Sequence, residues 1–206
     1  MTQTISKSQT ITFDEFLDWY PEDQRFELID GVIVEMQPTG KHEEIVEFLQ
    51  RKLIRETDRL NLPYRFPRQV LIKPLVWATG YLPDVIVLNP EYLEIEPLWK
   101  KSATLTLGKS IPLVIEVVST NWENDYARKL EDYEKMGILE YWIIDYLGLG
   151  GRRFIGIEKK PTISVYTLID NQYELQQFRD TQLIQSITFP ELQFTPAQIF
   201  NLSYLC

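Results

Sequence analysis

Apolar side chains recur at helical spacing in two stretches of the chain. Between residues 41 and 60 they lie three and four positions apart, which predicts a long helix. The segment 124–136 predicts a second helix, and Gly137 is a typical residue to end it. The capping box Thr12-Phe13-Asp14-Glu15 predicts a short helix that stops near Tyr20.

The shorter apolar runs predict strands. The first two flank Asp30-Gly31, a pair that is typical of a tight hairpin turn. Residues 89–110 lack a regular pattern, so we expect a loop there. Thr195 and Pro196 are typical of the start of a short final helix. The predicted strands are residues 26–29, 32–36, 68–72, 84–88, 113–118, 140–145, 154–157, 163–168 and 173–178.

The order of these elements predicts one α/β domain in which helices flank a mixed sheet. We expect residues 1–11 to form a flexible N-terminal tail and residues 12–206 to form the single domain. The sequence shows neither a signal peptide nor an apolar run long enough to span a bilayer. The expected location is therefore the cytoplasm, with no membrane contact.

The charge balance limits how the protein can meet nucleic acid. The chain carries 30 acidic and 21 basic side chains, a net charge of −9, which argues against binding by bulk electrostatics alone. Residues 51–68 differ, with six basic and two acidic side chains. Arg51, Arg55 and Arg59 share one face of the predicted helix. A solvated helix face is the favoured interpretation, and a phosphate-facing stripe is the alternative.

The metal-binding residue types are limited as well. One histidine and one cysteine exclude a zinc cage built from those residues. A metal site would be built mainly from carboxylates, which favours Mg²⁺, Mn²⁺ or Ca²⁺. The sequence also lacks a glycine-rich phosphate loop and the common serine-hydrolase and zinc-protease motifs. Carboxylates are therefore the first place to look for chemistry.

Glu116 interrupts an otherwise apolar strand, residues 113–118. Both faces of this strand carry apolar side chains, so we expect both faces to be covered and Glu116 to be buried. A buried carboxylate needs a proton, a cationic partner or a metal ion. Asp84 opens another apolar strand, and the two carboxylates can share one divalent ion if the strands are neighbours. The alternatives are a structural ion pair for Glu116 and a turn residue for Asp84.

Lys129 is the candidate cationic side chain. It lies on the predicted helix 124–136, where Asp125, Lys129 and Tyr133 share one face. If this helix crosses the end of the Glu116 strand, Lys129 can orient an attacking water or stabilise developing charge. A helix-surface ion pair between Asp125 and Lys129 is the alternative.

Other candidates are weaker. Glu27, the single charge in its predicted strand, could supply a third acidic group. His42 begins the long predicted helix, where a cap or surface position is the usual role and a catalytic role is the alternative. Tyr141 and Trp142 are interpreted as core residues.

The order of these residues resembles the PD-(D/E)xK nuclease superfamily, which has the restriction-endonuclease-like fold. More closely, the chain resembles a restriction-endonuclease-like family that is expanded in cyanobacteria. The resemblance covers nearly the whole chain. It rests on the segments Phe26–Gly31, Pro83-Asp84, Glu116–Ser119, Asp125…Lys129…Tyr133 and Gly137–Asp145.

The resemblance implies an endonuclease that hydrolyses DNA with Mg²⁺ or Mn²⁺. It implies that Asp84 and Glu116 bind the metal ion and that Lys129 assists the attacking water. Our hypothesis adds Glu27 as a further ligand. The superfamily pattern places its lysine two residues after the acidic residue, where this chain has Val118. Lys129 is the expected replacement, on the following helix.

Two other functions stay open at this point. A nuclease-fold protein without cleavage activity could serve as a module that binds nucleic acid or protein. Retained binding of a divalent metal ion would favour the active enzyme instead. A purely structural dimer is the third hypothesis, with Tyr141, Trp142 and the C-terminal strands at the interface. A homodimer is also expected by analogy with related nucleases.

Overall fold

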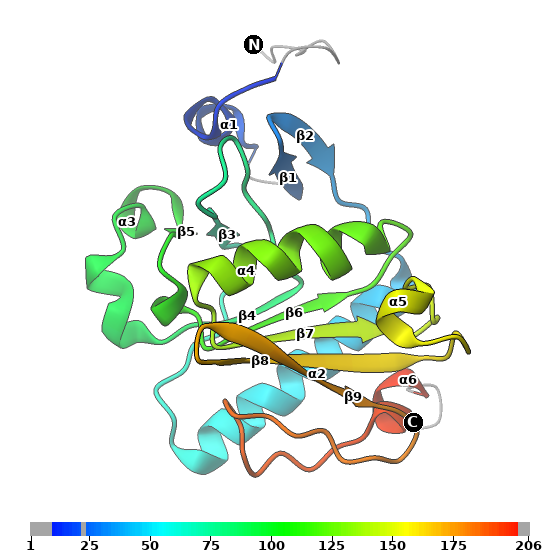
Figure 1. Cartoon of the computed structure of the whole chain (residues 1–206). Coiled ribbons are helices and arrows are strands. Elements are labelled where there is room, and N and C mark those ends of the chain that lie inside the picture. Colours follow the sequence, from blue (N-terminus) through cyan, green and yellow to red (C-terminus); the bar gives the residue numbers. More distant parts are fainter. Residues whose placement is uncertain (1–9, 22–23, 202–206) are drawn as a thin grey trace.

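The computed structural model describes residues 10–21 and 24–201, so residues 1–9 of the predicted N-terminal tail lie outside the described residues. A five-stranded sheet forms the centre, in the order β4-β6-β7-β8-β9 (Figure 1). β6 and β7 are parallel and the other neighbouring pairs are antiparallel, which confirms the mixed sheet. The strands are β4 (Val85–Val87), β6 (Leu113–Val117), β7 (Glu140–Asp145), β8 (Thr162–Ile169) and β9 (Gln172–Phe178).

Helices cover both faces of this sheet. In Figure 1, α2 (Gly40–Leu60) lies behind the sheet and α4 (Leu130–Met136) lies in front of it. Because successive side chains of a strand point to opposite faces, β6 contributes to two separate cores. Leu113, Ile115 and Val117 enter the core on the α2 side, and Val114 and Val118 enter the core on the α4 side.

A hairpin and a short helix pack beside the central sheet. The predicted hairpin is confirmed as β1 (Phe26–Ile29) and β2 (Val32–Glu35), joined by Asp30 and Gly31, which both have positive φ. The predicted capping box is also present before α1 (Phe13–Trp19). Aromatic side chains of α1 pack against the hairpin, so this unit forms one wall beside the sheet.

Residues 68–72 and 89–110 differ from the prediction, whereas the strand predicted over 84–88 is confirmed as β4. The strand predicted over 68–72 is reduced to β3 (Leu71–Ile72), which pairs with β5 (Thr104–Leu105) outside the central sheet. The segment 89–110 contains short helices, because Asn89 caps the first turn and Pro90 has the φ that a helix requires. These helices are η1 (Pro90–Ile95), α3 (Trp99–Ser102) and η2 (Gly108–Ser110).

The predicted strand over 154–157 is wrong. The segment contains one helical turn, α5 (Arg152–Ile155), which ends at Gly156 with a φ of 88°. Phe154 stacks on Tyr126 with 5.1 Å between ring centroids. The apolar side chain of Phe154 thus packs against another helix, and the segment does not join a sheet.

The predicted helix over 124–136 has two parts. Its first part, η3 (Asn124–Lys129), is a π-helix, and α4 continues from it. Gly137 ends α4 with a φ of 77°, as its position predicted. The final helix is confirmed as α6 (Pro196–Phe200), with its capping box at Thr195.

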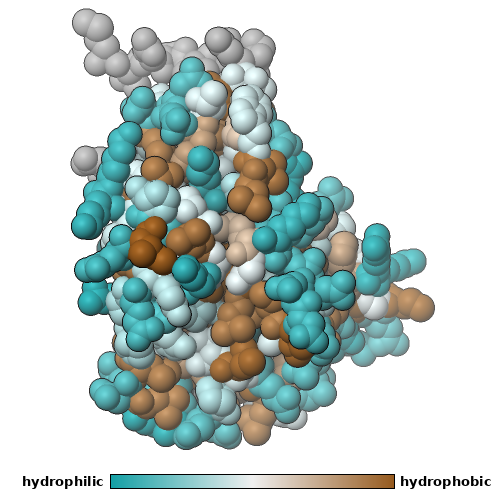
Figure 2. All heavy atoms as spheres, turned by 60° about the vertical axis from the view of Figure 1, so that its left-hand side comes forward, coloured by the Kyte–Doolittle hydropathy of each residue, from teal (hydrophilic) through white to brown (hydrophobic). Residues whose placement is uncertain are grey.

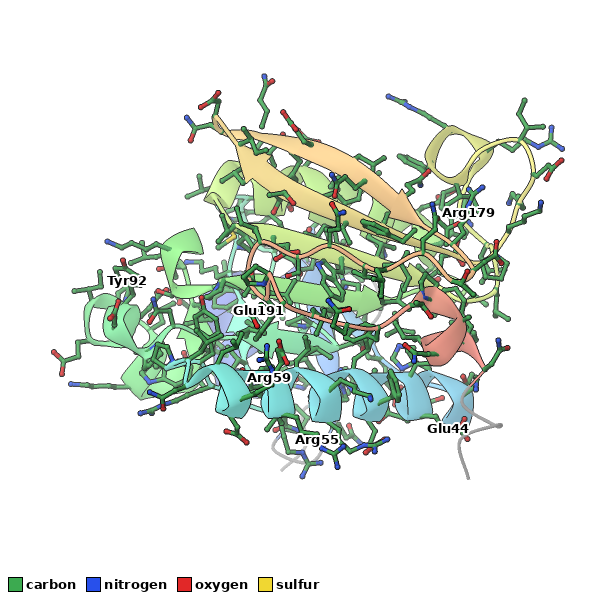
Figure 3. All side chains as sticks on the ribbon, turned by 90° about the horizontal axis from the view of Figure 1, so that it is seen from below. Glu44, Arg55, Arg59, Tyr92, Arg179 and Glu191 are labelled. Atoms are coloured by element: carbon green, nitrogen blue, oxygen red, sulfur yellow. The ribbon has the colours of Figure 1, made fainter. Side chains whose placement is uncertain are left out.

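The arginines of α2 form a solvated surface, as the favoured interpretation stated. Arg51 pairs with Glu47 at 2.9 Å. Arg59 pairs with Glu191 at 2.9 Å, and Figure 3 shows these two side chains facing each other. These ion pairs leave the face without a strong excess of positive charge.

The molecular surface is mixed in character. On the face shown in Figure 2, apolar side chains form separate patches between polar ones, which is ordinary for a protein surface. Tyr141 and Trp142 are fully buried, so the prediction that these two side chains form part of a dimer interface is wrong, whereas their interpretation as core residues is confirmed. Among the helices of residues 10–21 and 24–201, none is long and apolar enough to cross a membrane.

Candidate active site

Two neighbouring strands bring Asp84 and Glu116 close together. β4 and β6 are antiparallel, and Val85 pairs with Ile115. One step further along this register, Asp84 lies opposite Glu116. The backbone N–H of Val117 donates a hydrogen bond of 2.8 Å to Asp84 Oδ2. The two carboxylates therefore lie at the carboxyl end of β6.

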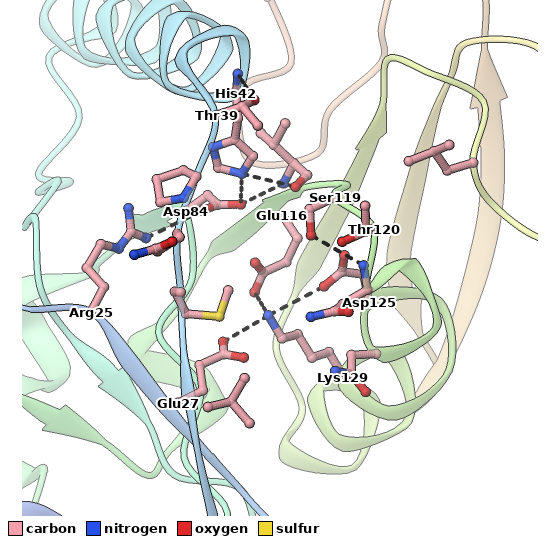
Figure 4. Close-up of a pocket in the computed structure, with 18 of the residues that line it drawn as sticks. Arg25, Glu27, Thr39, His42, Asp84, Glu116, Ser119, Thr120, Asp125 and Lys129 are labelled. Carbon is pink, nitrogen blue, oxygen red and sulfur yellow. Dashed lines mark hydrogen bonds and ion pairs between the residues drawn. The ribbon is translucent and has the colours of Figure 1, made fainter.

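Lys129 lies between three carboxylates (Figure 4). Its Nζ is 3.0 Å from Glu27 Oε1, 3.1 Å from Glu116 Oε1 and 3.4 Å from Asp125 Oδ1. The whole residue is only 1% exposed. The helix that carries Lys129 crosses the end of the Glu116 strand, which is the arrangement that the sequence analysis required for Lys129 to reach the site. Three acidic side chains share one ammonium group.

The π-helix η3 positions Asp125 and Lys129. In a π-helix the hydrogen bonds run from residue i to residue i+5, which widens the turn, and such turns are frequent at functional sites. Both side chains are buried against the sheet. The helix continues as α4, from which the Tyr133 hydroxyl donates to Glu116 Oε1 at 3.1 Å.

Glu27 enters the cluster from the hairpin. It is 2% exposed, and its Oε1 accepts a hydrogen bond of 3.1 Å from the backbone N–H of Leu82 as well as pairing with Lys129. Because the same oxygen serves both contacts, Glu27 holds the lysine and the loop before β4 in place.

Asp84 has two further partners that sequence reasoning missed. His42 is buried rather than at the surface, and its Nε2 lies 3.1 Å from both Asp84 Oδ2 and the Val117 carbonyl oxygen. Both neighbours accept, so Nε2 carries the proton. Arg25 approaches from the other side, with Nη2 3.4 Å from Asp84 Oδ1. Asp84 is thus held by donors from three elements.

One of these residues left a signal in the sequence. Arg25 precedes Glu27 by two residues, so in an extended chain both side chains project from the same face. His42 left no such signal, because its contact with Asp84 joins residues 42 positions apart.

Burial and neighbouring carboxylates raise the proton affinity of two of these acids. Burial raises the pKa of Glu116 well above its usual value, and neighbouring carboxylates add to this although Lys129 opposes it. Burial likewise raises the pKa of Asp125 to about 7. For Lys129, burial favours a lower pKa, but Glu116, Glu27 and Asp125 outweigh it and hold the pKa well above its usual range.

Asp84 has the opposite electrostatic setting. Burial favours a higher pKa, but the hydrogen bond and charge of His42 and the N–H of Val117 outweigh it and lower the pKa of Asp84. In return Asp84 raises the pKa of His42 against the effect of burial. Of the two carboxyl groups at the strand ends, Asp84 therefore loses its proton more readily than Glu116.

These side chains line one pocket of about 290 Å³. Its walls come from the β1–β2 hairpin, the start of α2, the ends of β4 and β6, η3 and the loop after β7. Buried carboxylates, a lysine and an arginine thus face a common space. Such a space can hold a cation together with an anionic group of a substrate.

A mixed sheet with helices on both faces and a carboxylate-lysine cluster at a strand end is the arrangement expected for the restriction-endonuclease-like fold. A sequence model of the Uma2 family, described as "Putative restriction endonuclease", matches residues 13–197. Because the match covers most of the chain, the protein belongs to this family. The resemblance predicted from the sequence is confirmed.

A solved structure supports the same fold. The crystal structure of a "putative nuclease" belonging to DUF820 from Anabaena variabilis ATCC 29413 matches with a TM-score of 0.70. The match covers 95% of this chain and 99% of the other, at 20% sequence identity. At this identity the likeness establishes the fold alone. No curated protein sequence matches the chain.

Proposed function

We propose that this protein is an endonuclease that hydrolyses DNA phosphodiester bonds in the pocket of Asp84 and Glu116, with Mg²⁺ or Mn²⁺ as cofactor. One observation carries the proposal: carboxylates from two neighbouring strands end beside a buried, charged lysine, Lys129. Membership of the Uma2 family, with its restriction-endonuclease description, supports this class of reaction.

The charges of the pocket fit a divalent cation. Four of the five carboxylates that line the pocket have buried side chains, and with two permanently cationic side chains they leave an excess of two negative charges when all are ionised. A divalent cation would offset this excess, and without one Glu116 and Asp125 bind protons more tightly than usual. Carboxylate oxygens are also the ligands that Mg²⁺ and Mn²⁺ prefer. The four carboxylates with buried side chains are Glu27, Asp84, Glu116 and Asp125, and the cations are Arg25 and Lys129.

Few protein ligands are needed for such an ion. Within the described part of the chain, His, Cys, Asp and Glu form no group of three or more that could hold a metal ion by itself. Mg²⁺ usually keeps several waters and binds one or two carboxylates together with substrate phosphates. Asp84 and Glu116 would be those carboxylates. A bound ion would polarise the phosphate and lower the pKa of a bound water.

The other side chains have supporting roles. Lys129 stays protonated and would donate hydrogen bonds to the attacking water or to the phosphate oxygen on which charge develops. Glu27 and Asp125 fix the position of its ammonium group. Tyr133 orients the Glu116 carboxylate, and outer partners of this kind tune a metal ligand.

A nuclease-fold module without cleavage activity is the alternative function. It would need neither the unpaired excess of acidic charge nor an open pocket at the strand ends. Such an excess makes the folded state less stable, and a cluster that costs stability is expected where chemistry requires it. This argument favours the enzyme.

Calorimetric titration with Mn²⁺, followed by a DNA cleavage assay, tests the proposal. Asp84→Asn and Glu116→Gln should each abolish measurable Mn²⁺ binding and cleavage. Glu131→Gln is the matched control, because Glu131 is exposed and pairs with Lys135 at the surface of α4. Equal Mn²⁺ binding by all variants would exclude this site, and Mn²⁺ binding without cleavage of any DNA would favour the interaction module.

A further inference from the structure

The guanidinium group of Arg25 has fewer acceptors than it can use. Its contacts are long: Nη2 is 3.4 Å from Asp84 Oδ1, and Nη1 is 3.7 Å from Glu43 Oε1. Its Nε is buried and has no hydrogen-bond partner among the described residues. A guanidinium offers five N–H donors in a fork that matches the oxygens of a phosphate. Arg25 lines the pocket and can therefore accept a further anion.

The start of α2 reaches the same pocket, which Thr39 and His42 line together with Arg25. Thr39 caps the helix, with its Oγ1 accepting from the His42 N–H at 3.3 Å. The N–H groups of Gly40 and Lys41 come before the first bonded turn, so the helix offers them no acceptor. A Cβ added at Gly40 would meet nothing within 4 Å, so the space above this residue is open. Helix starts of this kind favour anions.

A side-chain carboxylate lies between the Arg25 guanidinium group and the His42 ring at the start of α2. Glu43 Oε1 lies 3.6 Å from His42 Nδ1 and 3.7 Å from Arg25 Nη1. Nδ1 of His42 is itself buried without a hydrogen-bond partner among the described residues. Both distances exceed those of a good hydrogen bond, and the Glu43 side chain is 51% exposed. The carboxylate therefore approaches both nitrogens without binding either firmly.

We propose that Arg25 and the start of α2 form a subsite for a backbone phosphate of nucleic acid, and that Glu43 occupies this subsite until the substrate displaces it. A phosphodiester carries one negative charge, like the carboxylate that leaves, so the exchange keeps the local charge constant. The phosphate can form the short, charge-assisted bonds that Glu43 does not reach.

The subsite lies beside the proposed metal site. Arg25 contacts Asp84 directly, so a phosphate on Arg25 would be next to the residue that holds the cation. The inference rests on the proposed function, because it assigns the phosphate to the DNA substrate of the same pocket. Glu43 would thus make binding selective for ligands whose phosphate can compete with it.

Fluorescence anisotropy with a short labelled DNA duplex in EDTA tests the subsite. Glu43→Gln should tighten binding about tenfold, because the competing carboxylate is gone, and Arg25→Gln should weaken it about tenfold. Glu44→Gln is the matched control. It removes the same charge one residue further along α2, where Glu44 pairs with Lys41, and should change affinity by about twofold or less.

The gain of affinity in Glu43→Gln guards against misfolding, because an unfolded variant cannot bind more tightly. If Glu43→Gln and Glu44→Gln raise DNA affinity equally, the change in net charge explains the effect and the proposal is overturned. Unchanged binding in Arg25→Gln would overturn it as well. Titration of Glu43→Gln with inorganic phosphate separates the sources: free phosphate that binds as tightly as DNA would overturn the assignment to a nucleic-acid backbone.

The same variants distinguish this inference from the proposed function. Mn²⁺ titration of the wild type depends on Asp84 and Glu116 and needs no DNA. If the wild type does not bind Mn²⁺ but Arg25→Gln and Glu43→Gln change DNA affinity as expected, the metal-dependent reaction is excluded and the phosphate subsite is supported. If the wild type binds Mn²⁺ and cleaves DNA but the two variants bind DNA like the wild type, the reaction is supported and the phosphate subsite is excluded.

Discussion

Two buried glutamates lie on neighbouring strands at opposite ends of the sheet. Glu116 is at the carboxyl end of β6, whereas Glu140 opens β7 and pairs in register with Leu113. Glu116 is 2% exposed and Glu140 is 0% exposed. Burial raises the pKa of both carboxyl groups. Burial alone therefore does not separate a structural acid from a candidate catalytic one.

Their partners separate them. Glu140 accepts from Trp142 Nε1 at 2.8 Å, from Ser186 Oγ at 2.9 Å and from the Thr188 N–H at 2.9 Å. These donors are neutral, use both oxygens and tie the segment before α6 to the sheet. Glu116 shares a single ammonium group with two other carboxylates beside an open pocket. Crowded like charges next to a cavity, rather than burial, indicate a site for chemistry.

The largest expected effect is the loss of cleavage in Lys129→Met. Without the ammonium group the developing charge on the phosphate loses its donor, so the cleavage rate should fall about a hundredfold to a thousandfold. The measurement is a DNA cleavage assay with Mn²⁺. Lys135→Met removes an exposed lysine of α4 and should cleave like the wild type. Cleavage by Lys129→Met at the control rate would contradict the role of this residue.

The second expected effect is a pH dependence of stability that arises at Asp125. Burial raises the pKa of its carboxyl group to about 7 in the folded state, against a value of about 3.9 in an unfolded chain. The folded protein therefore binds the proton more tightly. The stability that this proton contributes is complete below the unfolded pKa and is lost as pH rises towards the folded pKa.

Urea unfolding in EDTA at several pH values measures this effect. Asp125→Asn should lose less stability than the wild type between about pH 4 and about pH 7. Glu131→Gln, in which the exposed partner of Lys135 changes, should follow the wild-type slope. A slope that is the same for Asp125→Asn and the wild type would show that the Asp125 carboxyl group does not retain its proton in the folded state.

The third prediction compares the two glutamates directly. In Glu140→Gln the new amide group would face N–H or O–H donors, because both oxygens of Glu140 accept, so unfolding should become easier by about 2 kcal/mol. Glu116→Gln removes one of three acids that share an ammonium group and should keep or raise stability. Urea unfolding in EDTA measures both. A greater loss for Glu116→Gln would reverse the distinction between the two sites.

The local parts of this comparison could be predicted from the sequence. The strand 113–118 has apolar residues on both faces, which fixes its burial and the face that Glu116 occupies. The Asp30-Gly31 turn and the residue order around Asp84 and Lys129 indicated the hairpin and the family. These features depend on neighbours in sequence, so short patterns specify them.

The parts that depend on distant contacts could not be predicted. His42 meets the Val117 carbonyl oxygen across 75 positions, and no local pattern records that contact. The six residues of η3 contain no sequence pattern that distinguishes a π-helical turn from an α-helix. The residues 154–157 have the composition of a strand, but Phe154 packs on Tyr126 and the first two of these residues belong to the helical turn α5. Tertiary packing decided each of these cases against the local preference.

The smallest expected effect comes from removing one hydroxyl group at each glutamate. Ser186→Ala deletes a donor to Glu140, and Tyr133→Phe deletes a donor to Glu116. Each should cost about 1 kcal/mol of unfolding free energy. Only Tyr133→Phe should also weaken Mn²⁺ binding, about tenfold, because its hydroxyl orients Glu116, the proposed metal ligand. Calorimetry on both variants measures this difference, and equal Mn²⁺ affinities would mean that Tyr133, like Ser186, serves stability alone.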